Sequence, residues 1–282
     1  NKVLNLGGGN AIYSVGAERQ YITHVTQEGQ PVGMFYGFNV VGMVREKDME
    51  AIAQDNANYN SATQSFPSGY VLKGPARSTA SSNPLRPGDL LFEDVNGDGV
   101  VNDADKRVIG TPYPKFIYGF SLSANYRDID LSASFNGSQG NQVLDGQDYY
   151  VYNMEASGNQ YASVLDRYRS EAQPGNGIVY RASRGGTQSN STRLSSFYLQ
   201  DGSYLRCTNI TLGYTLPTIL LNKVKISGLR VYANVNNAFT LTKYKGYNPE
   251  VDYNNGANLT PGVDYGKYPL ARGYNVGVRV TF

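Results

Sequence analysis

The chain closes with the sequence GYNVGVRVTF, residues 273–282, which alternates between two kinds of side chain. Successive side chains of a β-strand point to opposite faces, so the even positions of this stretch form one apolar face. The odd positions form a second face of polar or small residues. The stretch therefore predicts a β-strand that separates an apolar environment from a polar one.

The same period of two recurs upstream, clearly in four segments and more weakly in three. The clear segments are 116–126, 129–136, 209–216 and 229–236, and the weaker ones are 2–8, 11–27 and 31–45. Together with the terminal stretch, they predict an antiparallel all-β fold of about eight strands.

The connections between these segments differ greatly in length. Short turns at 28–30 and 127–128 and a modest connection at 217–228 alternate with long connections at 46–114, 140–202 and 241–271. Short turns on one side and long loops on the other are typical of outer-membrane β-barrels, whose long loops face outside. Tyrosines near the strand ends (Tyr126, Tyr214 and Tyr274) fit an interfacial aromatic girdle. A soluble sandwich or barrel with one solvated face also alternates, so it stays an alternative.

The composition narrows the function. The net charge of +2 gives no strong positive field that would favour nucleic acid. One cysteine, Cys207, and one histidine, His24, are too few for a zinc site, and we expect Cys207 on the polar face of its strand. The sequence has no run of about 18 apolar residues that would predict a membrane helix, and no nucleophile, phosphate-loop or dinucleotide motif. We therefore expect no catalytic residue.

Residues 94–105, with the sequence DVNGDGVVNDAD, match the template of a calcium-binding loop. Side-chain oxygens alternate along the first half, a glycine permits the sharp turn, and an acid stands at position twelve. That acid is aspartate in place of glutamate, and its side chain is shorter by one methylene group. An Asx-rich turn without calcium is the alternative. The predicted structural Ca²⁺ ligands are Asp94, Asn96, Asp98, the Val100 carbonyl, Asn102 and Asp105.

A second candidate site is the aromatic and acidic run 145–153, with the sequence DGQDYYVYN. Tyrosine together with asparagine and aspartate is typical of surfaces that bind sugars or peptides by stacking and hydrogen bonding. The predicted substrate contacts are Asp148, Tyr149, Tyr150 and Tyr152. Packing between loops is the alternative. The same two interpretations, binding and packing, apply to the tyrosines of the last long loop, which are Tyr244, Tyr247, Tyr253, Tyr265 and Tyr268.

Several stretches resemble one family. They read GDLLFEDVNGDG at 88–99, IGTPYPKFIYGF at 109–120, DGSYLR at 201–206, NITLGY at 209–214, NNAFTLTKYKGYNPE at 236–250 and GVRVTF at 277–282. The resemblance is to the SusC/RagA-type TonB-dependent transporters of Bacteroidetes outer membranes. The matching stretches are spread over nearly the whole chain.

This resemblance implies a 22-stranded barrel with an N-terminal plug that the TonB complex drives. It also implies a SusD-like surface lipoprotein that captures glycans or peptides above the barrel. Residues 1–282 would then be the C-terminal portion of the barrel, embedded in outer-membrane lipid, with the plug outside this chain. The rival functions are a secreted calcium-stabilised β-domain that binds carbohydrate and a glycosidase. The sequence has no carboxylate pair outside the calcium loop, which counts against a glycosidase.

Overall fold

A computed structural model of the chain divides it into two compact units. The structure describes residues 1–16, 21–60, 62–63, 65–67, 69, 75–76, 85–154, 158–183, 190, 193–221, 226–252 and 256–282. Unit 1 comprises 1–112, 144–199 and 252–265, and unit 2 comprises 113–143, 200–251 and 266–282. No helix in these described ranges is long and apolar enough to cross a membrane.

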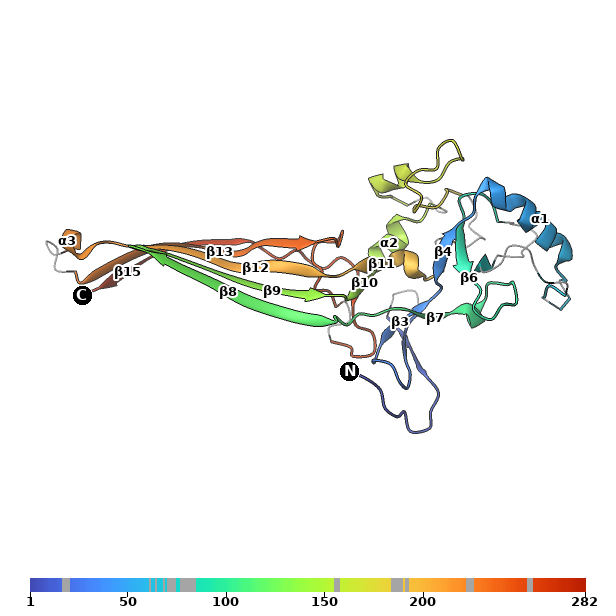
Figure 1. Cartoon of the computed structure of the whole chain (residues 1–282), viewed down its shortest axis with the longest axis horizontal. Coiled ribbons are helices and arrows are strands. Elements are labelled where there is room, and N and C mark those ends of the chain that lie inside the picture. Colours follow the sequence, from blue (N-terminus) through green and yellow to red (C-terminus); the bar gives the residue numbers. More distant parts are fainter. Residues whose placement is uncertain are drawn as a thin grey trace. The chain divides into compact units, whose positions relative to one another are not determined.

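Unit 2 is built on a five-stranded antiparallel sheet whose strands run side by side (Figure 1). The strand order is β15-β13-β12-β9-β8. Each strand coincides with one of the clearly alternating sequence segments, so the predicted all-β barrel portion is confirmed at these positions. The strands are β8 (Phe116–Tyr126), β9 (Ile129–Gln139), β12 (Tyr204–Thr215), β13 (Gly228–Thr242) and β15 (Gly273–Thr281).

The connections of this sheet are as uneven as the sequence predicts. β8 and β9 are joined by a two-residue turn in which Arg127 has a φ of 53°. β12 and β13 are joined through the short helix α3 (Thr218–Leu221). Much longer segments connect β9 to β12 and β13 to β15. Most of the first segment and nearly half of the second belong to unit 1.

Five of the roughly eight expected strands form this sheet, and the weakly alternating upstream segments do not join it in the described residues. Segments 11–27 and 31–45 form short strands that pair within unit 1, and 2–8 contains no strand. These short strands are partly buried by the loops packed around them, so their residues follow no clean two-residue alternation. Unit 1 strands are β1 (Ile12–Val15), β2 (Ile22–Thr26), β3 (Met34–Gly37), β7 (Arg107–Gly110), β4 (Val40–Met43), β6 (Leu90–Glu93) and β5 (Pro75–Ala76).

The two small sheets of unit 1 have the orders β1-β2-β3-β7 and β4-β6-β5. A parallel pairing joins Leu144 and Asp145 of β10 (Gln142–Asp145) to β14 (Val263–Asp264), and β11 (Leu199–Asp201) is a further short strand. The helices are α1 (Met49–Asn58) and α2 (Gly146–Val151), with 3₁₀ turns at Glu46–Asp48, Asp103–Asp105, Ala162–Asp166 and Ser196–Tyr198. Segment 159–170 contains the 3₁₀ turn Ala162–Asp166.

Unit 1 is held together by three apolar clusters drawn from segments far apart in the sequence. The first packs Phe38 and Phe92 with Tyr152 and Tyr180. The second packs Phe35 with Leu144, Tyr149, Tyr198 and Val263, and the third packs Val44 with Ile52 of α1 and Leu91. The long connections thus have cores of their own.

The sheet of unit 2 has one face of exposed apolar side chains. On β15, Tyr274 is 71% exposed and Val276 is 80% exposed. Equivalent positions on the other strands are also exposed, among them Leu122, Leu131 and Leu212. Soluble monomers rarely expose so large a contiguous apolar surface, so this face requires an apolar partner.

A β-bulge at Thr208 changes which face Cys207 occupies. The pairing with β9 and β13 shifts between Cys207 and Asn209, and Thr208 is an extra residue relative to β9. Cys207 consequently pairs with Phe135 and Phe239, and it is fully buried. Cross-strand partners share a face, so the expectation that Cys207 lies on the polar face is wrong.

Candidate functional site

The acidic loop 94–105, between β6 and β7, is a series of turns closed by its own side chains. The Asp94 carboxylate accepts the backbone N–H groups of Gly97 and Gly99, both at 2.7 Å. Asn96 accepts the N–H of Asp98 at 3.0 Å, one turn further along. Gly97 and Gly99 have φ angles of 77° and 82°, which favour glycine and let the chain reverse.

The fully buried Asp105 closes the loop. Its two carboxylate oxygens accept the N–H groups of Val95 at 3.0 Å and Asn102 at 2.8 Å. Asn102 in turn caps the 3₁₀ turn Asp103–Asp105 by accepting the N–H of Ala104 at 2.7 Å. The acid at position twelve is therefore already fixed in place by the backbone.

The chemistry of this loop suits calcium, although its geometry here is that of a turn. Each carboxylate oxygen that accepts one N–H keeps a second lone pair, and Ca²⁺ prefers oxygen ligands. However, within the described residues no three His, Cys, Asp or Glu side chains gather as a metal site requires. The Asx-rich turn is directly observed, and calcium binding stays a prediction.

The aromatic run 145–153 starts at the last residue of β10 and continues into α2. Asp145 caps α2 by accepting the N–H groups of Gln147 and Asp148. Asp148, Tyr149 and Tyr152 are buried, and only Tyr150 of the four predicted contacts is half-buried. The Tyr152 hydroxyl shares a hydrogen bond of 2.8 Å with Ser163. Packing between loops thus describes three of these residues, and substrate contact stays a prediction, with Tyr150 the most accessible.

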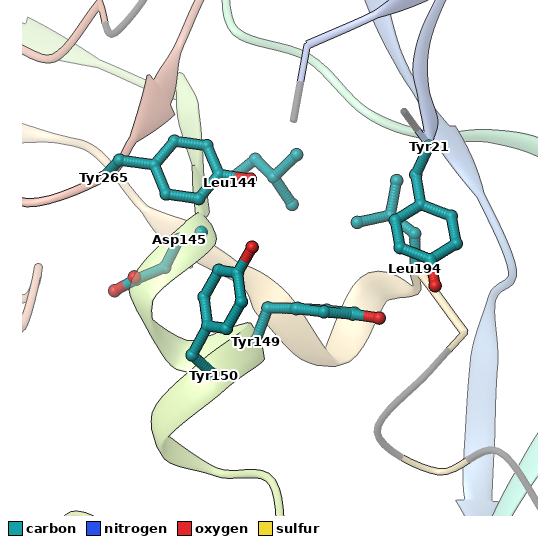
Figure 2. Close-up of a pocket in the computed structure, with 8 residues that line it drawn as sticks. Tyr21, Leu144, Asp145, Tyr149, Tyr150, Leu194 and Tyr265 are labelled. Atoms are coloured by element: carbon teal, nitrogen blue, oxygen red, sulfur yellow. The ribbon is translucent and has the colours of Figure 1, made fainter. Parts of the chain in front are cut away.

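Tyr150 borders a small cavity, here called the tyrosine hollow, which is lined by Tyr21, Leu144, Tyr149, Tyr150, Leu194 and Tyr265. Figure 2 shows these side chains gathered around a common space. The ring centroids of Tyr149 and Tyr150 are 5.4 Å apart, and those of Tyr150 and Tyr265 are 6.4 Å apart. The free volume is about 10 Å³, enough for one water molecule, so a larger ligand would require a tyrosine to rotate.

A second and larger hollow adjoins the first, because both are bordered by Tyr21 and Leu194. This arginine cleft has a volume of about 610 Å³ and is also lined by Phe38, Asp103, Lys106 and Arg193. Its size is within the range of roughly 300–1,000 Å³ that is usual for small-molecule sites. Unit 1 therefore offers an aromatic hollow beside an open, charged cleft.

Arg193 is the principal charge of the cleft. Its guanidinium lies 5.3 Å from the ring centroid of Phe38 and 5.2 Å from that of Phe92. Burial lowers the pKa of Arg193 to about 10, while the negative charges of Asp105 and Asp103 oppose that shift. The group still carries its positive charge at neutral pH.

The polar face of the unit 2 sheet carries a network of hydrogen-bonded side chains. Arg206, which is 4% exposed, forms an ion pair with Glu250 and donates to Asn248 at 2.8 Å and to Thr240 at 3.1 Å. Tyr204 also donates to Glu250. Segment 243–250 is thereby fixed to the sheet, and this face is polar without being fully solvated.

Amide and hydroxyl side chains continue the polar face along the strands. Asn209 donates to Asn236 at 3.0 Å, and Asn234 donates to Thr211 at 2.8 Å. Asn275 of β15 donates to Asn234 at 3.3 Å. The sheet therefore has one apolar face and one face of cross-strand polar contacts, as the wall of a polar lumen requires.

Comparison with known proteins identifies the family of this chain. No family model matches the chain. The chain is 31% identical over 271 residues to the TonB-dependent receptor P39 of Formosa agariphila and 28% identical over 290 residues to its TonB-dependent receptor P3. It is 29% identical over 198 residues to the TonB-dependent receptor SusC of Bacteroides thetaiotaomicron. The chain belongs to the TonB-dependent receptors of the SusC/RagA type.

The solved structures extend this agreement to the fold. A chain from the structure of the RagAB peptide transporter matches 99% of this chain with a TM-score of 0.65 and 19% identity. The present chain spans about a quarter of the length of these SusC/RagA-type relatives, with 26% of P3 and 25% of the RagAB chain covered. It is therefore a fragment of such a barrel.

The sequence contains no local pattern that indicates the arginine cleft. Arg193 is preceded and followed by no recognisable motif, and its aromatic neighbours Phe38 and Phe92 are about 100 residues or more away along the chain. Tyr21 and Lys106 are similarly scattered. Only the fold brings these side chains together, so no local pattern could have predicted the cleft.

Proposed function

We propose that this chain forms part of the wall and the external loops of an outer-membrane importer that depends on TonB. The observation that carries the proposal is the sheet with one exposed apolar face and one hydrogen-bonded polar face. In a bilayer the apolar face is solvated by lipid and the polar face lines the lumen. The function is that of a transporter, with no catalytic step assigned to these residues.

The edges of the sheet support a larger barrel. In the part of the chain that the structure describes, β8 pairs only with β9 and β15 pairs only with β13. An unpaired strand edge cannot face hydrocarbon, because its N–H and C=O groups would lack hydrogen bonds. Both edges therefore call for neighbouring strands from the rest of the barrel, which is the first partner that we propose.

The finer assignments rest on the relatives. By analogy with SusC and with the protein named a RagAB peptide transporter, we propose uptake of oligosaccharides or peptides together with a SusD-like lipoprotein. Connections 46–114, 140–202 and 241–271 would face outside, and the plug that contacts the TonB complex would lie elsewhere in the full protein. Ca²⁺ in loop 94–105 would stiffen the first of these connections.

Cell fractionation and uptake measurements test this function. We expect the full-length receptor in the outer-membrane fraction, released only by detergent, and we expect uptake of its oligosaccharide or peptide substrate to stop when TonB is removed. Recovery of the receptor in the aqueous phase would contradict the proposal. That result would favour the alternative, a secreted calcium-stabilised β-domain that binds carbohydrate.

A further inference from the structure

Arg193, which is half-buried, has no carboxylate partner among the residues that the structure describes. In the described residues its only hydrogen bond is a long one of 3.4 Å, from Nη2 to the Val101 carbonyl oxygen. A guanidinium has five N–H donors, so most of the donors of Arg193 are unused. By contrast, three other arginines are paired with carboxylates: Arg181 with Asp89, Arg206 with Glu250 and Arg230 with Asp130.

A second cation shares the same aromatic ring. The Lys106 ammonium lies 5.5 Å from the ring centroid of Phe38, which Arg193 also approaches. Lys106 is paired with the exposed Asp103 at 2.8 Å, so that pair is close to neutral. The buried Asp105 directs both oxygens to backbone N–H groups of its own loop. The charge of Arg193 is therefore left without a direct counter-charge.

A half-buried charge without a counter-charge is costly, and a ligand anion is one way to offset that cost. The fork of a guanidinium matches the two oxygens of a carboxylate. A single unpaired positive charge also suits a monovalent carboxylate better than a divalent phosphate, since Asp103 and Asp105 lie nearby. We propose that the arginine cleft binds a carboxylate group, held by two hydrogen bonds from Arg193, with the aromatic wall at Tyr21 beside it.

The carboxylate could belong to an acidic sugar or to the C-terminus of a peptide, and a binding experiment separates these sources. The full-length receptor in detergent is titrated calorimetrically with glucuronate, with dialanine, and with glucose and dialanine amide as counterparts that lack the carboxylate. We expect at least one carboxylate to bind at millimolar concentration and the counterpart that lacks it not to bind. Arg193→Gln should weaken binding at least tenfold. Arg107→Gln removes the same charge from a surface arginine outside the cleft and should leave binding unchanged.

Chemical modification of the unmutated receptor gives a second readout, which remains valid if Arg193→Gln does not fold. We expect a saturating carboxylate to slow the reaction of Arg193 with phenylglyoxal and to leave that of Arg107 unchanged, as measured by peptide mass spectrometry. The proposal is overturned if neither carboxylate binds, if phosphate binds more tightly than both, or if folded Arg193→Gln binds as the unmutated receptor does. It is equally overturned if a bound carboxylate leaves Arg193 unprotected. Because no step involves transport, failure of the import proposal would leave these results interpretable.

Discussion

Arg230 of β13 and Asp130 of β9 form a two-pronged ion pair across the intervening strand β12. Nε of Arg230 is 2.9 Å from one carboxylate oxygen of Asp130, and Nη2 is 2.5 Å from the other. Gly213 of β12 makes this possible, because a Cβ at that position would collide with both side chains. One glycine thus allows a charge pair to link three strands on the polar face.

We expect Gly213→Ala to destabilise the receptor by roughly 1–3 kcal/mol, the usual cost of overpacking a tight site. The added methyl group would displace the Arg230 side chain from Asp130. The measurement is the temperature at which the folded receptor unfolds in detergent. Gly119→Ala is the matched control, because its Cβ would meet only ordinary contact at 3.5 Å from the Phe135 carbonyl oxygen. Equal unfolding temperatures for the two variants would contradict this role of Gly213.

We expect Val276→Lys to prevent stable insertion in the outer membrane, since a lysine on the lipid face costs about 2–4 kcal/mol near the midplane. Val276 is 80% exposed on the apolar face. Asn275→Lys places the same charge one residue earlier, on the polar face of the strand, and should be tolerated. The amount of each variant in the outer-membrane fraction provides the comparison. Equal assembly of both variants would show that the apolar face does not contact lipid.

We expect Ca²⁺ to bind loop 94–105 of the full-length receptor and Asp98→Ala to abolish that binding. Asp98 supplies a predicted ligand at position five, whereas Asp103 occupies position ten, which contributes no ligand. Asp103→Asn is therefore the control, and it should bind Ca²⁺ nearly as well. Isothermal titration measures all three proteins. An unmutated receptor without a calcium-binding heat would leave the Asx-rich turn as the sufficient description.

We expect the region around His24 to lose stability as the pH falls. His24 is fully buried, and burial lowers its pKa from 6.5 to about 4. Its Nε2 donates to the Pro261 carbonyl oxygen at 2.9 Å, and its Nδ1 shares a hydrogen bond of 2.6 Å with the Thr23 hydroxyl. The unfolded form therefore takes up a proton first, so the stabilisation is complete above pH 6.5 and decreases between pH 6.5 and 4. The shift corresponds to about 3 kcal/mol at most.

Hydrogen exchange tests this pH dependence in the full-length receptor. After correction for intrinsic exchange rates, amides of β2 should exchange faster at pH 5 than at pH 7. His24→Gln removes the titrating group and should show no such difference, whatever its absolute stability. Identical pH profiles for the variant and the unmutated receptor would assign the effect to another group.

The extent to which sequence predicted this structure follows from the range of the interactions involved. Strands β8, β9, β12, β13 and β15 each repeat one period of two along many residues, so the pattern is local and visible. Cys207 was misplaced because a single extra residue, Thr208, reverses the alternation without any compositional sign. The three cores of unit 1 could not be predicted, because each combines residues from several distant segments.

The candidate sites also differ in whether they depend on contiguous residues or on residues far apart in the sequence. Loop 94–105 is contiguous, so its turns and backbone hydrogen bonds agree with the template read from sequence. The run 145–153 predicted accessible tyrosines, yet Tyr149 and Tyr152 are buried in apolar clusters that the run itself does not contain. Composition indicated an aromatic surface, and only the fold shows which rings remain accessible.

The bulge at Thr208 also determines how related chains should be compared. Upstream of it, Arg206 lies on the polar face, and downstream of it Asn209 and Thr211 do, so residues on one face change from even to odd numbers. The Thr208 hydroxyl donates to the Ser134 carbonyl oxygen at 3.0 Å, which fixes the irregularity in place. Deletion of this one residue would restore an unbroken alternation and would leave Arg206, Asn209 and Thr211 on the same polar face. A one-residue gap in an alignment at this position therefore marks the loss of the bulge, and the two surfaces of the strand stay the same.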